Sequence, residues 1–226
     1  MTTQNQDTGT ERALRALRAL TDDRPSVRLR AALEMGTHPD PGHVGALVER
    51  CAVEPDFPVR EMLTWALTRL PAGTTVPPLM DEVRSALPQA RSQALHTLSK
   101  VGDPRAWPAI TPELLADPDD EVARSAWRAA VALVPEGEER RLAESLAAQL
   151  GRGGRETRLS LSRALIALGE VIVPVLDGAA AASDPAVRAH AIATERLLRD
   201  PDEGFEFAVE QAKRCVALGG EDPGEG

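Results

Sequence analysis

Large aromatic side chains are scarce in this sequence of 226 residues, which contains three Trp, three Phe and no Tyr. Strands favour aromatic and β-branched residues, so this scarcity argues against a β-sandwich and favours closely packed helices rich in Ala, Leu and Val. Hydrophobic residues make up 42% of the chain, which is too large a share for a fully disordered polypeptide. The composition therefore predicts an all-α globular protein.

Long apolar runs and cysteine frameworks are also missing. No stretch approaches the roughly 18 apolar residues of a membrane span, and the N-terminal MTTQNQDTGT lacks the pattern of a signal peptide. Cys51 and Cys215 are far apart and fit neither a disulfide framework nor a CxxC zinc site. We expect a cytoplasmic protein without membrane association, in which both cysteines are buried as small apolar residues.

Catalytic motifs are absent as well. The sequence has no GxxxxGK[ST] loop and no G-x-S-x-G elbow. Its four histidines, His38, His43, His96 and His190, form no metal-ligand cluster in sequence. We therefore expect a protein that is not an enzyme, with no catalytic residue, metal or cofactor.

Positive charge is outnumbered, with 26 Lys and Arg against 35 Asp and Glu and a net charge of −9. This balance argues against a general nucleic-acid binder, because attraction to phosphates relies on Lys and Arg.

What the sequence does contain is a repeat. A Val-Arg pair or a close relative recurs at anchor residues 27, 59, 90, 122, 157 and 187, with gaps of 32, 31, 32, 35 and 30 residues. The anchor and the positions 4, 7, 8 and 11 residues later share one face of a helix and carry mostly apolar residues. Each unit therefore contains an amphipathic helix, which we call the Val-Arg helix.

A second helix is expected in the rest of each unit. Pro78, Pro108 and Pro174 lie near the starts of three of these helices, where a proline suits the first turn. The expected ranges are Val44–Val53, Val76–Leu87, Arg105–Ala116, Glu138–Leu150 and Val171–Ala182, with Glu11–Leu20 before the first Val-Arg helix and Gly204–Leu218 capping the last pair. Because one pair cannot bury its apolar face alone, the pairs should stack. We predict a repeat domain over residues 10–218, between a disordered N-terminus (1–9) and a disordered acidic tail (219–226).

The recurring segments resemble HEAT-type repeats, in the short bacterial form named after phycobilisome lyases. The resemblance is carried by Asp56-Phe-Pro-Val-Arg60, Asp184-Pro-Ala-Val-Arg188 and Val101-Gly-Asp-Pro-Arg105-Ala-Trp-Pro108. It implies a right-handed α-α superhelix, a HEAT-like solenoid of about six helix pairs. It also implies a structural ladder, in which the anchor arginines bind the adjoining turns: Arg28, Arg60, Arg91, Arg158 and Arg188. Ala123 breaks this ladder, and Arg124 is one candidate to replace the missing arginine.

The side of each Val-Arg helix opposite the core holds the positions 2, 6 and 9 residues after the anchor, and we call these 18 positions the groove face. They include four Arg and one Glu, so the groove face is modestly positive on an acidic protein. A Trp flanked by guanidinium groups suits an acidic peptide or a phosphate-bearing ligand. The expected contact residues are Trp65, His96, Arg124, Arg128, Arg163, Arg196, Leu29 and Leu33.

These features favour a non-catalytic scaffold or adaptor that binds a protein or peptide partner in its concave groove, where an acidic partner would suit the positive charge. One alternative is a nucleic-acid binding protein or glycosylase similar to the DNA-alkylation-repeat family, with Trp65, Trp127 and Arg128 near a lesion. A second alternative is a lyase-like or chaperone-like accessory subunit. The identity of the partner and the oligomeric state stay open.

Overall fold

The computed structural model describes residue 11, residues 13–200 and residues 205–217. The predicted disordered segments 1–9 and 219–226 and the side chain of Cys215 lie outside the described residues. Every regular element in the described part is a helix, as the composition predicts. The chain forms two compact units that meet in sequence between Ala109 and Ile110.

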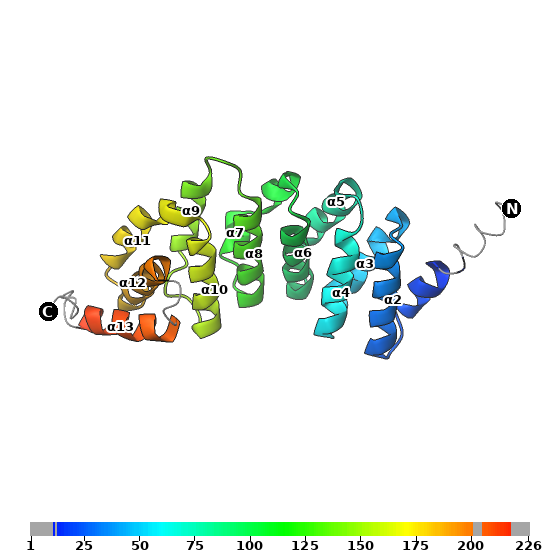
Figure 1. The fold of residues 1–226 in the computed structure, drawn as a ribbon, viewed down its shortest axis with the longest axis horizontal. Helices are drawn as coiled ribbons and strands as arrows, with labels where there is room; N and C mark the ends of the chain where they lie inside the picture. The colour runs from blue at the N-terminus through cyan, green and yellow to red at the C-terminus, as the bar shows by residue number, and fades with distance from the viewer. Residues whose placement is uncertain (1–10, 12, 201–204, 218–226) are drawn as a thin grey trace. The chain divides into compact units, whose positions relative to one another are not determined.

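Unit 1 contains the first three Val-Arg helices, α2 (Pro25–Thr37), α4 (Phe57–Thr68) and α6 (Pro88–Val101). These three helices lie side by side, with α3 (Val44–Val53) and α5 (Ala72–Glu82) packed behind them (Figure 1). Two short 3-10 helices, η1 (Pro41–His43) and η2 (Pro104–Ala109), complete the unit. The large side chains that are fully buried between the layers are Met35, Leu47, Leu63, Leu67, Leu79, Leu95 and Leu98.

Unit 2 repeats this arrangement with the Val-Arg helices α8 (Asp120–Leu133), α10 (Arg155–Ile166) and α12 (Pro185–Arg199). The second layer consists of α7 (Pro112–Leu115), α9 (Glu139–Ala147), η3 (Gly169–Ile172) and α11 (Val173–Ala180), and α13 (Phe205–Ala217) ends the unit. Trp127 is its largest fully buried side chain, and its Nε1–H donates to the carbonyl of Leu115 at 2.8 Å. This bond satisfies the polar end of a buried indole.

Three of the six Val-Arg helices begin at an aspartate N-cap. Asp56, Asp119 and Asp184 are N-caps whose carboxylates accept hydrogen bonds from first-turn amides of α4, α8 and α12. Such caps satisfy donors that have no partner inside the helix. A first-turn proline accompanies the cap in α4 and α12.

The second helices differ more from the sequence-based expectation. The helix expected at Val76 begins at Ala72, so Pro77 and Pro78 lie inside α5 rather than near its start. The helix expected over Arg105–Ala116 is divided into η2 and α7. Two prolines, Pro108 within η2 and Pro112 at the start of α7, interrupt backbone hydrogen bonding there.

Both units contain a buried polar cluster at equivalent repeat positions. In unit 1, Gln93 donates to Thr64 at 2.9 Å, and the Thr64 and Thr97 hydroxyls lie 3.1 Å apart. In unit 2 the corresponding residues are Ser162, His190 and Thr194, with Ser162 Oγ 3.0 Å from His190 Nε2 and 2.8 Å from Thr194 Oγ1. Each cluster joins the second and third Val-Arg helices of its unit and satisfies polar groups that are removed from water.

The C-terminal helix does more than cap the last pair. It runs crosswise to α12 (Figure 1), and its residues Ala208 and Ala212 pack in one apolar cluster with Ala193 and Leu197. Leu159 and Ala189 pack against the same cluster. Because Ala193, Leu159 and Ala189 are groove-face positions, α13 packs against part of this face in the last two repeats.

Candidate functional site

Four of the five predicted ladder arginines hold the turn that precedes their own helix. In each case Nη1 donates to the carbonyls six and five residues earlier, at 2.7–3.3 Å. The four are Arg28, Arg60, Arg91 and Arg188. These bonds satisfy turn carbonyls and fix each Val-Arg helix to the chain that enters it.

In the fourth repeat, which lacks a ladder arginine at Ala123, Arg152 from the following loop holds the turn. Its guanidinium donates to the carbonyl of Asp117, six residues before Ala123, and pairs with Asp120 at 2.9 Å. Thr157, which stands at the next anchor in place of Val, donates to the same carboxylate at 3.0 Å. Arg124 does not take over the ladder position, because its guanidinium pairs with Glu121 at 2.8 Å.

Arg158 departs from the ladder. No hydrogen bond from its guanidinium to a preceding turn is present in the described residues, and its Nε is buried without a partner there. Arg158 instead lines a hollow between the start of α10 and α13. This is a departure that its position in the repeat did not predict.

Glu54 is a completely buried carboxylate that the sequence analysis did not identify. It accepts two hydrogen bonds of 2.7 Å from Arg28, one of 2.8 Å from Arg50 and one of 2.9 Å from the Asp56 amide. Burial alone would raise the pKa of the Glu54 carboxyl, but the hydrogen bonds from Arg28, Asp56 and Arg50 outweigh it and lower the pKa to about 2. The cluster ties α2 to the turn between α3 and α4, so its role is structural.

In unit 1 the groove face carries an aromatic ring and two leucines. Trp65 is 37% exposed and Leu33 is 46% exposed, while Leu29 is half-buried. The His96 ring is also half-buried, and its Nε2 lies 3.2 Å from Glu61 Oε1. The expected contact residues in unit 1 are therefore mostly apolar, and His96 pairs with Glu61.

The position of the Trp65 ring depends on Gly36 of the preceding repeat. A Cβ added at Gly36 would lie 2.2 Å from Trp65 Cζ3 and 2.6 Å from Cε3, so the indole lies directly against the α2 backbone. Only a residue without a side chain permits this approach.

Gly36→Ala is therefore expected to displace the Trp65 ring and lower the free energy of unfolding by about 1–3 kcal/mol, as overpacking does. Comparing the tryptophan fluorescence of Gly36→Ala in the wild-type and Trp65→Phe backgrounds would isolate the shift of this ring. Gly45→Ala is the matched control, because an added Cβ there meets no atom within 4 Å. An unchanged Trp65 emission in Gly36→Ala would contradict this packing.

In unit 2 the groove face forms a hollow of about 290 Å³ between α8 and α10, which we call the α8–α10 hollow. Three predicted contact residues line it together, Arg124 and Arg128 from α8 and Arg163 from α10. The other lining residues are Val131, Ala132, Glu156, Leu159, Ser160 and Ala164. The sequence pattern thus identified residues that the fold does bring together.

Two of the three guanidinium groups in the α8–α10 hollow have donors left for a ligand. Arg163 has no hydrogen-bond or ion-pair partner for its side chain among residues 13–200 and 205–217, and the Nε of Arg124 is buried without one. Arg128 donates to Ser125 at 3.0 Å. With three arginines and one glutamate, the lining is positive, and its aliphatic residues supply an apolar floor.

The remaining expected contact residue, Arg196, is half-buried on α12 and does not line the α8–α10 hollow.

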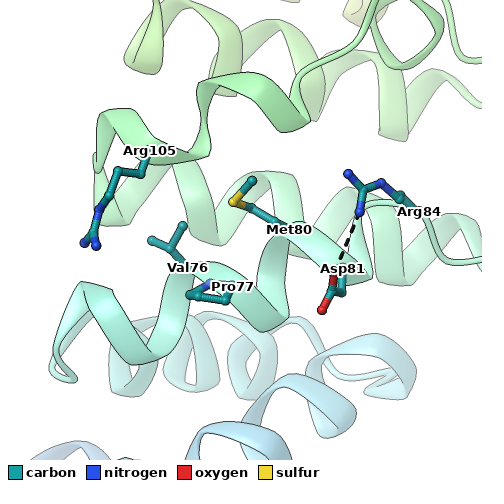
Figure 2. Close-up of a pocket in the computed structure, with 6 residues that line it drawn as sticks. All are labelled: Val76, Pro77, Met80, Asp81, Arg84 and Arg105. Carbon is teal, nitrogen blue, oxygen red and sulfur yellow. Dashed lines mark ion pairs between the residues drawn. The ribbon is translucent and has the colours of Figure 1, made fainter.

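In unit 1 a smaller hollow of about 240 Å³ lies between α5 and η2 (Figure 2). Its two arginines already have carboxylate partners, since Arg84 faces Asp81 at 3.7 Å and Arg105 binds Asp103 at 2.6 Å. The α8–α10 hollow is therefore the stronger candidate for a charged ligand.

Metal-ligating side chains do not cluster in the described part of the chain. No three His, Cys, Asp or Glu side chains converge there as a metal site requires. Burial raises the pKa of the Cys51 thiol to about 12, which leaves it uncharged at neutral pH.

No single described helix is long and apolar enough to cross a membrane. The bent pair of segments Arg155–Ile166 and Gly169–Ala180 has a sufficient length and composition when the two are taken together.

One comparison with known families agrees with the repeat pattern over part of the chain. Residues 44–133 match the family model described as HEAT repeats. Among solved structures the chain is similar to the complex of CpcE and CpcF of phycocyanin lyase from Nostoc sp. PCC7120, with a TM-score of 0.49 and 20% identity over 91% of this chain and 85% of that chain. No curated protein matches the sequence. The predicted all-α class is thus confirmed in the described residues, and the predicted HEAT-type repeats are matched over residues 44–133.

Proposed function

We propose that this HEAT-like repeat protein is a non-catalytic scaffold whose groove face binds an acidic segment of a protein partner. The observation that carries the proposal is the α8–α10 hollow, where three arginines surround an apolar floor. Guanidinium groups recognise carboxylates through two parallel hydrogen bonds, and arginine is enriched among residues that dominate binding energy.

The helical architecture supports this use of the hollow. Arg124, Arg128 and Arg163 project from two packed helices, so their backbones are held before a partner arrives. Little conformational entropy of the backbone is then lost on binding. The whole chain has a net charge of −9 and repels acidic molecules. Only local positive surfaces such as this hollow can therefore attract an acidic segment.

Reversing two charges of the hollow is expected to weaken binding of an acidic partner at least tenfold, because like charges then face each other across the interface. The test measures the fluorescence anisotropy of a labelled glutamate-rich decapeptide with wild type and with Arg128→Glu/Arg163→Glu. Affinity capture from the host with the same two proteins would follow. A matched control is Arg140→Glu/Arg141→Glu, since both of these exposed arginines lie on α9 outside the hollow.

Three results would count against the scaffold proposal. The first is equal peptide affinity in the wild type and the hollow variant. The second is an equal loss in the α9 control, because bulk charge would then explain the effect. The third is capture of nucleic acid alone, which would favour the lesion-binding alternative. That alternative requires a ring on which a base can stack, yet the lining of the α8–α10 hollow is without an aromatic residue, and Trp127 is buried against Leu115.

A further inference from the structure

A second positively charged hollow, of about 430 Å³, lies between the first turn of α10 and the middle of α13, and we call it the α10–α13 hollow. Gly153, Gly154, Arg155 and Arg158 form its α10 side, and Val209, Glu210 and Lys213 form its α13 side. It is separate from the α8–α10 hollow, with which it shares no lining residue.

Arg158 is the observation that points to a ligand. The other four ladder arginines each hold two turn carbonyls, which is the structural use of this repeat position. Arg158 makes no such bond in the described residues, and its Nε is buried without a hydrogen-bond partner there. A buried guanidinium nitrogen without a partner is energetically costly, so a native structure usually satisfies it with a protein group, a water or a ligand.

The surroundings of Arg158 favour a negatively charged partner. Arg155, which pairs with Glu156 at 3.3 Å, and Lys213, which pairs with Glu210 at 2.8 Å, line the same hollow. Glu210 is the one acidic residue of its lining, so the lining keeps a net positive charge. The N-cap of α10 is Gly154, which has no side chain to accept bonds from the first-turn amides. Those amides and the positive end of the helix dipole add to the attraction for an anion.

The space at Gly154 is open. A Cβ added at this glycine would meet no atom within 4 Å, so a ligand can approach the backbone of the first turn. Gly153 and Gly151 have φ values of +66° and +83°, which hold the preceding loop in a conformation that suits glycine. Because Gly153 and Gly154 have no side chains, this part of the loop does not cover the first turn of α10.

We propose that the α10–α13 hollow binds the phosphate group of a small phosphorylated molecule. A phosphate dianion has three terminal oxygens, which match guanidinium, ammonium and amide donors arriving from several directions. The volume of about 430 Å³ lies in the range of small-molecule sites, so it also accommodates an organic part beside Val209 and Glu210. This inference is independent of the proposed binding of an acidic partner by the α8–α10 hollow.

Because the ligand contacts both α10 and α13, it would hold α13 in its position across α12. Binding would therefore stabilise the last two repeats, as any ligand that binds only the folded state does. The expected observable is a protection of α13 amides from hydrogen exchange when the phosphorylated molecule is present.

The experiment uses the full chain and titrates it with glycerol 3-phosphate, followed by amide chemical shifts in NMR and by calorimetry. We expect saturable shifts of the Gly153, Gly154 and Arg155 amides, and no such shifts with glycerol. Arg158→Gln/Lys213→Gln should weaken the affinity at least tenfold. Arg141→Gln, which removes an exposed arginine on α9, should leave it unchanged.

A second variant keeps the test valid if the double variant does not fold. Gly154→Asp introduces a favourable N-cap into open space, so the helix should be retained or stabilised. Its carboxylate would occupy the place of the phosphate, and binding of glycerol 3-phosphate should be lost. Absence of saturable shifts in the wild type, or unchanged affinity in folded Gly154→Asp, would overturn the proposal.

Discussion

Glu54→Ala is expected to lower the free energy of unfolding by about 3–5 kcal/mol, the range for breaking a buried ion pair. Glu54 is completely buried and binds Arg28, Arg50 and the Asp56 amide. Its removal leaves the buried Arg28 guanidinium without the partner of its Nε and Nη2 groups. Urea denaturation followed by tryptophan fluorescence and circular dichroism would measure the loss.

Two further variants make this prediction specific. Asp81→Ala removes an exposed carboxylate that faces Arg84 at 3.7 Å, and its effect should stay within about 1 kcal/mol. Arg28→Met/Glu54→Leu removes the two most deeply buried charges of the cluster together and should be more stable than Glu54→Ala, because the Arg28 guanidinium is no longer left without its carboxylate. Equal loss in Glu54→Ala and Asp81→Ala would show that the Glu54 cluster does not stabilise unit 1.

The second large effect is a loss of stability of unit 2 in mild acid, caused by His190. Burial lowers the pKa of His190 to about 4 from the ordinary histidine value of 6.5. Its Nδ1 accepts from the Gly151 amide at 3.0 Å, and its Nε2 lies 3.1 Å from the Arg158 carbonyl. The neutral ring fits these partners with the hydrogen on Nε2.

The direction follows from proton binding in the two states. Between pH 6.5 and pH 4 the unfolded chain protonates this histidine and the folded chain does not, so acidification favours unfolding. The full loss from this group is about 3 kcal/mol, since each pKa unit corresponds to about 1.4 kcal/mol. Urea midpoints measured from pH 7.5 to pH 4.5 should fall through this window.

His190→Gln is the matched variant for the acid prediction, because Gln93 stands at the equivalent position of unit 1 and donates to Thr64 there. The variant should depend less on pH between 6.5 and 4.5 than the wild type does. A folded-state pKa near 6.5 for His190, measured by NMR titration, would refute the prediction. So would an identical pH profile in His190→Gln.

Some features of the site followed from repeat spacing alone. Arg124, Arg128 and Arg163 are two or six residues after their anchors, and a helical period places these positions on the side away from the core. The structure assembles all three in the α8–α10 hollow. Likewise, N-caps such as Asp56 could be predicted because a cap depends on its own sequence neighbours.

Other features depended on partners that are distant in sequence. Arg152 holds the carbonyl of Asp117 35 residues away, which no local pattern predicts. One signal was present, because Ala123 lacks the ladder arginine and Thr157 replaces the anchor valine in the repeat that follows. The pairing of Glu54 with Arg28 over 26 residues also had no sequence signature.

The sequence by itself determined the all-α class, the repeat period and the surface on which each Val-Arg helix presents its arginines, because these depend on composition and on residues within a few turns of one another. Only the tertiary structure decided which groove-face positions stay open. It placed α13 over Ala193 and Ala189 and left Arg124, Arg128 and Arg163 uncovered. The reason is that packing between segments depends on which apolar surfaces meet after the chain has folded back, and helical periodicity carries no information about that choice.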